Sequence, residues 1–334
     1  MRPYPTLALR AMFVSSLILV SSAQAQQAQI GFGVNSVGTL FRFDVNAPSA
    51  VTTIGPLGFV PKGIDFRPGT NSLYAIDIGP NTTQLYTIDI NTGSPTAVGA
   101  GFNSSGPGYD LTGNQTFGFD FNPKTLQGDN SMRIRLVSTS NANLRLNSST
   151  GQIATIDTNL AFANGNSPFV DGSAYINNIP QTPQAGGTTS LYNLDVRNNS
   201  LLLQNPPNAG TVSIVGPFGV TINNTERNTH FDIFTPLDNN DPTIGGDFAY
   251  AVLKRPDAPI NGPFGSYLLY NVDLSSGQIL NGALVGPAAT PFDFVGGFAV
   301  SPIPEPGSMV FIGMTAVTLV GWQMRRRQVK VDQQ

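Results

Sequence analysis

Apolar and polar residues alternate along many short segments of the chain, and the segments resemble one another. In segment 85–93 the side chains of Tyr86, Ile88 and Ile90 fall on one face, as the period of a β-strand requires. The Asn-Thr-Gly that follows suits a tight turn, because Asn hydrogen-bonds the backbone and Gly adopts a positive φ. This segment therefore predicts a strand that ends in a hairpin.

The same pattern recurs four more times. The copies lie at 40–45, 144–151, 191–196 and 269–277, and each strand carries Asp or Asn at its end. These turn residues are Asp44, Asp89, Asn147, Asp195 and Asp273. The recurrence indicates a chain built from one repeated β unit.

Each unit also has an opening strand, such as Gly63–Pro68 and the similar Gly118–Pro123, with later openers at 172–176 and 231–234. No convincing amphipathic helix lies between residues 26 and 303. The remaining strands are expected at 30–34, 38–46, 51–55, 73–78, 84–90, 96–99, 132–138, 143–147, 152–157, 190–196, 200–204, 211–216, 248–253, 267–274 and 278–286. Four strands per unit at a spacing of about 40 to 50 residues are typical of propeller blades.

The two ends of this region complement each other. Segment 294–302 resembles an opening strand without a blade, whereas the first unit has strands but no opener. Joining them completes a fifth blade and removes exposed sheet edges. The sequence therefore predicts an all-β propeller of five four-stranded blades, with a pair of β-sandwiches or a six-bladed propeller as the alternatives. Segments 236–246 and 256–265 are expected to be loops on one face.

Composition agrees with this fold class and narrows the chemistry. Only 11% of the residues are charged, and the 36 glycines and 26 prolines suit many turns, while 40% hydrophobic residues suffice for a core. A net charge of −3 without a basic patch in the body argues against nucleic acid as a partner. The absence of cysteine excludes disulfides, thiolate metal sites and thiol nucleophiles.

The N-terminus has the features of a secretory signal peptide over residues 1–25. Arg2 and Arg10 provide its positive region, a short apolar run follows, and Ala23 and Ala25 fit a cleavage site for signal peptidase. The mature chain is expected to begin near Gln26, with the propeller domain at 26–303.

The C-terminal segment 304–334 has three parts in order. Pro304, Glu305 and Pro306 come first, an apolar run at 309–322 follows, and Arg325, Arg326 and Arg327 end it. The run predicts a short transmembrane helix with the arginines on the cytoplasmic side. This tail resembles the PEP-CTERM sorting signal of Gram-negative bacteria. The resemblance implies cleavage by an exosortase, with the protein anchored in the inner membrane before processing and then released to the cell surface or extracellular polysaccharide matrix.

The body resembles an uncharacterised family of exported bacterial proteins, domain-of-unknown-function family 4394. The residues that carry the resemblance lie at 63–68, 118–123, 133–135 with 143–151, and 202–211. It implies a propeller-like fold and no particular activity.

The sequence contains no recognisable set of catalytic residues. His230 is the single histidine, so a Ser-His-Asp triad would have to use it, and we expect a strand-end polar residue instead. Three aspartates, Asp65, Asp120 and Asp232, occupy like positions in opening strands, with Asp293 before a fourth candidate. If they converge on the channel, they could act as glycosidase carboxylates or bind Ca²⁺. Their repetition favours a structural role, in which each fixes a turn or backbone amide between blades.

Two further groups of charged residues are candidates. The loop Asp238–Asp241 offers oxygen ligands for Ca²⁺ but lacks the spacing of an EF-hand. Arg133, Arg135 and Arg145 are expected to pair with the channel aspartates or to contact an acidic polysaccharide.

The sequence thus predicts a non-enzymatic surface or matrix protein that binds glycan or protein and needs no cofactor, Ca²⁺ being the one ion considered. The alternatives are a polysaccharide-active enzyme that uses the channel carboxylates and a purely structural module.

Overall fold

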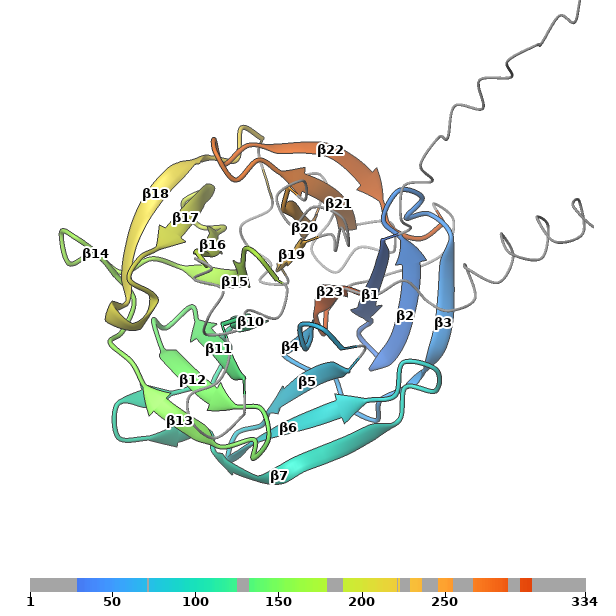
Figure 1. The fold of residues 1–334 in the computed structure, drawn as a ribbon, viewed down its shortest axis with the longest axis horizontal. Helices are drawn as coiled ribbons and strands as arrows, with labels where there is room; N and C mark the ends of the chain where they lie inside the picture. Colours follow the sequence, from blue (N-terminus) through green and yellow to red (C-terminus); the bar gives the residue numbers. More distant parts are fainter. Residues whose placement is uncertain are drawn as a thin grey trace, which may run out of the picture.

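The computed structural model describes residues 29–70, 72–124, 132–178, 189–220, 222, 229–235, 246–254, 267–287 and 295–301. These residues form five sheets, each with four antiparallel strands, arranged as blades around a common axis (Figure 1). Four blades follow one another along the chain. Blade 1 consists of β4 (Gly63–Phe66), β5 (Leu73–Ile78), β6 (Thr82–Ile88) and β7 (Pro95–Asn103). Blade 2 consists of β10 (Phe117–Phe121), β11 (Arg133–Ser138), β12 (Asn143–Asn147) and β13 (Ile153–Ile156).

Blade 3 consists of β15 (Val170–Tyr175), β16 (Leu191–Asp195), β17 (Ser200–Gln204) and β18 (Thr211–Pro217). Blade 4 consists of β19 (His230–Phe234), β20 (Phe248–Lys254), β21 (Tyr267–Val272) and β22 (Ile279–Leu284). Blade 5 combines β23 (Phe298–Val300) with β1 (Ile30–Val34), β2 (Thr39–Asp44) and β3 (Val51–Pro56). The first strand of each blade, β4, β10, β15, β19 or β23, lies nearest the axis (Figure 1).

The ring closes as the sequence predicts. β23 pairs antiparallel with β1, and Gly31 faces Val300 while Gly33 faces Phe298. The last described strand of the chain therefore supplies the innermost strand of the blade that the first strands build. Five closed blades confirm the predicted propeller and exclude both the sandwich and the six-bladed alternatives.

The repeated turns form as expected at four of the five positions. The Oδ1 atoms of Asp44, Asp89, Asn147 and Asp273 each accept a hydrogen bond from the backbone N–H two residues later, at 2.8 Å. Each of these residues ends, or directly follows, the third strand of its blade.

The equivalence of Asp195 with these residues is wrong. Asp195 ends β16, which is the second strand of blade 3, and the third strand is β17. An Asp-containing turn can end any strand of an antiparallel sheet, so this signal does not show which strand it follows.

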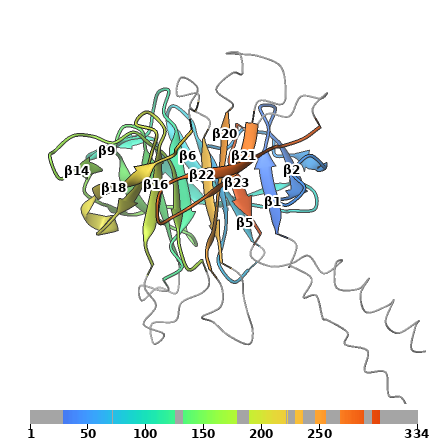
Figure 2. The same ribbon diagram turned by 90° about the horizontal axis from the view of Figure 1, so that it is seen from above.

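Three short strands were not predicted. β8 (Ser105–Gly106) and β9 (Tyr109–Asp110) form a small hairpin after blade 1. β14 (Ala161–Phe162) adds a fifth strand to blade 3 by pairing parallel with β18 at the outer rim (Figure 2). Segments of two residues have no measurable period, so pattern analysis cannot detect them.

Apolar side chains from facing blades fill the space between each pair of neighbours. Blades 1 and 2 share a large cluster that includes Tyr74 and Phe121, and the other interfaces have clusters of their own. The cluster between blades 2 and 3 is the smallest, with Val137, Leu160 and Val170 among its members. A polar network described below lies at this same interface.

Among the described residues, no helix is long and apolar enough to cross a membrane. The predicted signal peptide 1–25, the sorting tail 304–334 with its apolar run 309–322, and the loop 256–265 lie outside the described residues, as does 236–245.

Candidate functional site

Three aspartates meet on the axis of the propeller. Asp65 on β4, Asp120 on β10 and Asp232 on β19 each place a carboxylate oxygen within 4.8 Å of the other two. All three side chains are almost fully buried, with 2–3% of their surface exposed. The other two innermost strands have alanine at the like positions, Ala174 and Ala299.

Each aspartate connects its blade to the next blade around the ring. Oδ2 of Asp65 accepts the N–H of Phe121 at 2.7 Å, and Oδ2 of Asp120 accepts that of Tyr175 at 2.9 Å. Oδ2 of Asp232 accepts the N–H of Val300 at 2.6 Å. The structure therefore gives each carboxylate the structural role that repetition favours, and it also brings all three together.

Burial raises the pKa of these carboxyl groups. Burial and the neighbouring carboxylates hold the pKa values of Asp65 and Asp120 well above the usual range. Burial also raises the pKa of Asp232 to about 6, although the N–H groups of Val300 and Ile233 oppose this. In the described part of the chain, no basic side chain contributes to the pKa of any of the three.

A small cavity lies among the innermost strands, next to the residues that precede the aspartates. This cavity of about 20 Å³ is lined by the residues that directly precede the aspartates, Ile64, Phe119 and Phe231, and by His230. This volume suffices for about one water molecule. His230 is the first residue of β19, the strand-end position expected for it. Asp293 and the loop 238–241 lie outside the described residues.

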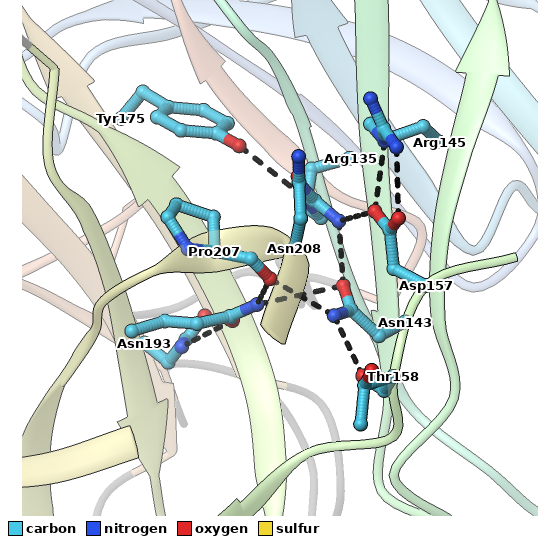
Figure 3. Close-up of polar contacts among 10 residues, drawn as sticks. Arg135, Asn143, Arg145, Asp157, Thr158, Tyr175, Asn193, Pro207 and Asn208 are labelled. Atoms are coloured by element: carbon cyan, nitrogen blue, oxygen red, sulfur yellow. Dashed lines mark hydrogen bonds and ion pairs between the residues drawn. The ribbon is translucent and has the colours of Figure 1, made fainter. Parts of the chain in front are cut away.

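The predicted pairing of arginines with the channel aspartates is wrong. Arg135 is 1% exposed and pairs instead with Asp157, its Nη1 lying 2.7 Å from Oδ2 (Figure 3). Arg145 binds both oxygens of the same carboxylate at 2.8 Å. Arg133, at the start of β11, faces Asn147 across the sheet.

The guanidinium of Arg135 is enclosed by further polar groups. It donates to Oδ1 of Asn143 at 2.7 Å, to the hydroxyl of Tyr175 at 3.3 Å and to Oδ1 of Asn208 at 2.7 Å. The network joins β11 and β12 of blade 2 to blade 3 (Figure 3). A side chain held so deeply cannot contact a polysaccharide, which removes that alternative for Arg135. Nothing in the spacing of Asp157 marks it as the partner, since it follows β13 and meets Arg135 and Arg145 only through the strand pairing of blade 2.

Asp171 is a further buried acid that the sequence pattern did not single out. It lies on β15, is 1% exposed, and neither carboxylate oxygen accepts a hydrogen bond from a described residue. Burial holds the pKa of Asp171 well above the usual range, and the nearby charge of Asp195 raises it further.

A groove of about 890 Å³ lies at the outer rim of blade 3. Its lining comes from the loop that carries β14 on one side, and from β18 and the segment around the start of β17 on the other. Its lining contains no charged residue and consists of Phe162, Ala163, Asn164, Asn166, Ser167, Asn198, Ser200, Val212, Ser213 and Ile214. The groove depends on an insertion between blades 2 and 3 whose structure the repeat pattern does not predict.

Comparisons with known proteins identify the domain. The family described as Domain of unknown function (DUF4394) matches residues 39–293. The comparison with curated proteins found no match.

Several solved structures are similar at low scores. A protein from Lactobacillus plantarum is 11% identical with a TM-score of 0.35, and the match covers 82% of this chain and 99% of that one. A protein of unknown function from Bacteroides caccae is 8% identical with a TM-score of 0.35, over 83% of this chain and 100% of that one. The WD40 domain of SCAP from fission yeast is 11% identical with a TM-score of 0.34, over 79% and 71%. The propeller assignment rests on the sheets themselves.

Proposed function

Because this chain belongs to domain-of-unknown-function family 4394, whose description names no activity, we propose a function from its own surface: a non-catalytic, exported module that binds an uncharged glycan. The observation that carries this proposal is the uncharged groove on blade 3.

The lining of the groove suits a sugar chain. Sugars present hydroxyl groups around their ring edges and apolar C–H groups on their ring faces, so a binding site needs amide or hydroxyl groups beside apolar side chains. The side chains of Asn166, Ser167 and Ser213 make no hydrogen bond with the rest of the described chain. They lie beside the half-buried ring of Phe162 and the side chain of Ile214, which is 61% exposed.

The absence of charge selects among glycans. An acidic polysaccharide requires basic partners, and none of the ten lining residues is basic. We therefore assign a neutral polysaccharide, and we expect acidic polymers to bind weakly or not at all.

The burial of the channel carboxylates supports a non-catalytic role. A retaining glycosidase needs two carboxyl groups on either side of the scissile bond, about 5 Å apart and open to substrate. Asp65, Asp120 and Asp232 lie close together, but their side chains are only 2–3% exposed and a backbone amide occupies one oxygen of each. A polysaccharide cannot reach them in this arrangement.

The predicted export of the protein supports a ligand in the extracellular polysaccharide matrix. The predicted signal peptide and PEP-CTERM-like tail support export of the propeller across the inner membrane, with processing by signal peptidase and an exosortase. Extracellular polysaccharide and surface proteins are the candidate partners for a protein exported in this way.

The test is co-sedimentation of the purified protein with insoluble neutral glucans, and affinity electrophoresis in gels that contain a neutral or an acidic polysaccharide. We expect retardation by a neutral polymer whose size does not change. Phe162→Ala and Ile214→Asn should each weaken binding at least about tenfold, because each removes apolar contact area.

Val37→Asn provides the matched control for Ile214→Asn, since Val37 is 75% exposed and lies outside the groove lining. If Val37→Asn loses as much binding as Ile214→Asn, or if no neutral polymer binds, the groove is not the glycan-binding site. Shortening of the polymer would favour the enzyme alternative.

A further inference from the structure

Two buried oxygens in the channel cluster have no hydrogen-bond partner. Oδ1 of Asp65 and Oδ1 of Asp120 belong to side chains that are 2% exposed, and neither accepts a hydrogen bond from any described residue. The second oxygen of each side chain is already occupied by a backbone N–H from the next blade. A buried carboxylate oxygen without a partner is costly, so a ligand that satisfies it is expected.

The geometry points to a divalent cation bound jointly by Asp65, Asp120 and Asp232 on the axis of the propeller. Oxygens that ligate one Ca²⁺ lie 2.3–2.6 Å from it, so two of them are at most about 5 Å apart. The three carboxylates each place an oxygen within 4.8 Å of the others, which fits this limit. An all-oxygen set selects a hard cation such as Ca²⁺, Mg²⁺ or Mn²⁺.

The contrast with Asp157 shows what the cluster lacks. Asp157 is also buried, and two arginines neutralise it at 2.7 and 2.8 Å. The channel cluster brings three acids together with no basic side chain in the described chain to neutralise them.

A bound cation would hold three of the five blades together at their inner strands. Each ligand already accepts an N–H from the following blade, so the ion would connect β4, β10 and β19 directly. This structural role is independent of the glycan groove, which lies at the outer rim of blade 3.

The test is metal analysis and calorimetry on the purified protein. After treatment with a chelator and dialysis, Ca²⁺, Mg²⁺ or Mn²⁺ is added at neutral pH. We expect one ion per chain by isothermal titration. The melting temperature should rise saturably, by roughly 5 °C or more at a hundredfold excess over the Kd.

Asp120→Asn and Asp65→Asn should abolish both effects, because asparagine retains an acceptor for the backbone N–H but loses the charge. Asp171→Asn is the matched control, because Asp171 is a buried acid on an innermost strand but does not belong to the cluster. This variant should bind the cation as the unmodified protein does.

If none of the three ions binds or shifts the melting temperature, the proposed cation site is wrong, and protons neutralise the cluster instead. Binding that survives in both cluster variants would place the ion elsewhere. If either variant fails to fold, the stoichiometry and melting shift of the unmodified protein still decide.

Discussion

At the scale of single residues, this protein buries its acids in different ways. Asp157 is neutralised by two arginines, whereas Asp65 accepts a backbone N–H from the neighbouring blade. Asp171 has neither kind of partner in the described chain. The cost of burial therefore differs from one acid to the next, and it can be measured residue by residue.

Asp171 predicts an unusual dependence of stability on pH. An unfolded aspartate releases its proton near pH 3.9, whereas burial holds the folded pKa of Asp171 well above that. As the pH rises between these two values, only the folded state keeps the proton, so this residue makes the protein less stable. Asparagine mimics the protonated acid at every pH. Asp171→Asn should therefore raise the melting temperature at pH 7, and the gain should shrink to nothing below about pH 4.

Calorimetry between pH 3.5 and 8 measures this difference. Asp89→Asn is the control, because Asp89 is exposed and its pKa is lowered by the N–H of Asn91. An equal melting temperature for Asp171→Asn and the unmodified protein at pH 7 would contradict the prediction.

Asp157 predicts a large loss of stability when it is removed. In Asp157→Ala the guanidinium of Arg135 stays 1% exposed but loses its only acidic partner among the described residues. Removing one partner of a buried ion pair costs about 3–5 kcal/mol. Urea denaturation measures the free energy of unfolding, and Asp110→Asn, at an exposed position, should change it by less than about 0.5 kcal/mol. A loss below about 1 kcal/mol for Asp157→Ala would show that the network contributes little.

At the scale of elements, stability depends on contacts between blades as well as pairing within them. The interface between blades 2 and 3 has the smallest apolar cluster and the Arg135 network, whereas blades 1 and 2 share a large apolar cluster. The blade built by β23 and β1 is the only one among the described strands that joins distant parts of the chain.

Removing β23 should open the ring. A chain that ends at residue 294 lacks the three residue pairs between β23 and β1 and the N–H of Val300 that Asp232 accepts. It also exposes β1 as an edge strand, which promotes association. We expect a melting temperature lower by about 10 °C or more, and oligomers in size-exclusion chromatography.

A chain that ends at residue 303 keeps every described strand and serves as the control. Similar melting curves for the two truncated chains would show that closure contributes nothing to stability.

At the scale of the whole molecule, the proposed function combines predicted export with the binding groove on blade 3. In this proposal the predicted signal peptide and sorting tail direct the propeller out of the cell, where the groove on blade 3 offers an uncharged binding surface. Export predicts cleavage at both termini, and this can be tested without knowing the ligand.

The mature protein should be shorter than the 334-residue chain at both ends. Mass spectrometry of the protein recovered from a Gram-negative host that has an exosortase should give an N-terminus near Gln26 and a C-terminus near Pro304. Replacing Arg325, Arg326 and Arg327 by alanine should leave the N-terminal cleavage intact and reduce the C-terminal one. A mature chain that retains residues 309–322 would contradict processing of the tail.

The sequence by itself determined the repeated architecture. Strands 30–34, 73–78, 143–147 and 200–204 begin and end as predicted, and the incomplete first and last units indicate the closure. These features are local or repeated, because a period of two and an Asp-containing turn can be recognised within a few residues.

Only the tertiary structure decided which residues meet between blades. Arg135 faces Asp120 across the sheet of blade 2, but it pairs with Asp157, which follows β13 on the outer side of the same blade. A periodic pattern likewise does not reveal that Asp195 ends the second strand of its blade. It also does not reveal the two-residue strand β14. The groove, the unpartnered oxygens of the channel and the Arg135 network all lie where strands distant in the sequence come together, and no local pattern records such distances.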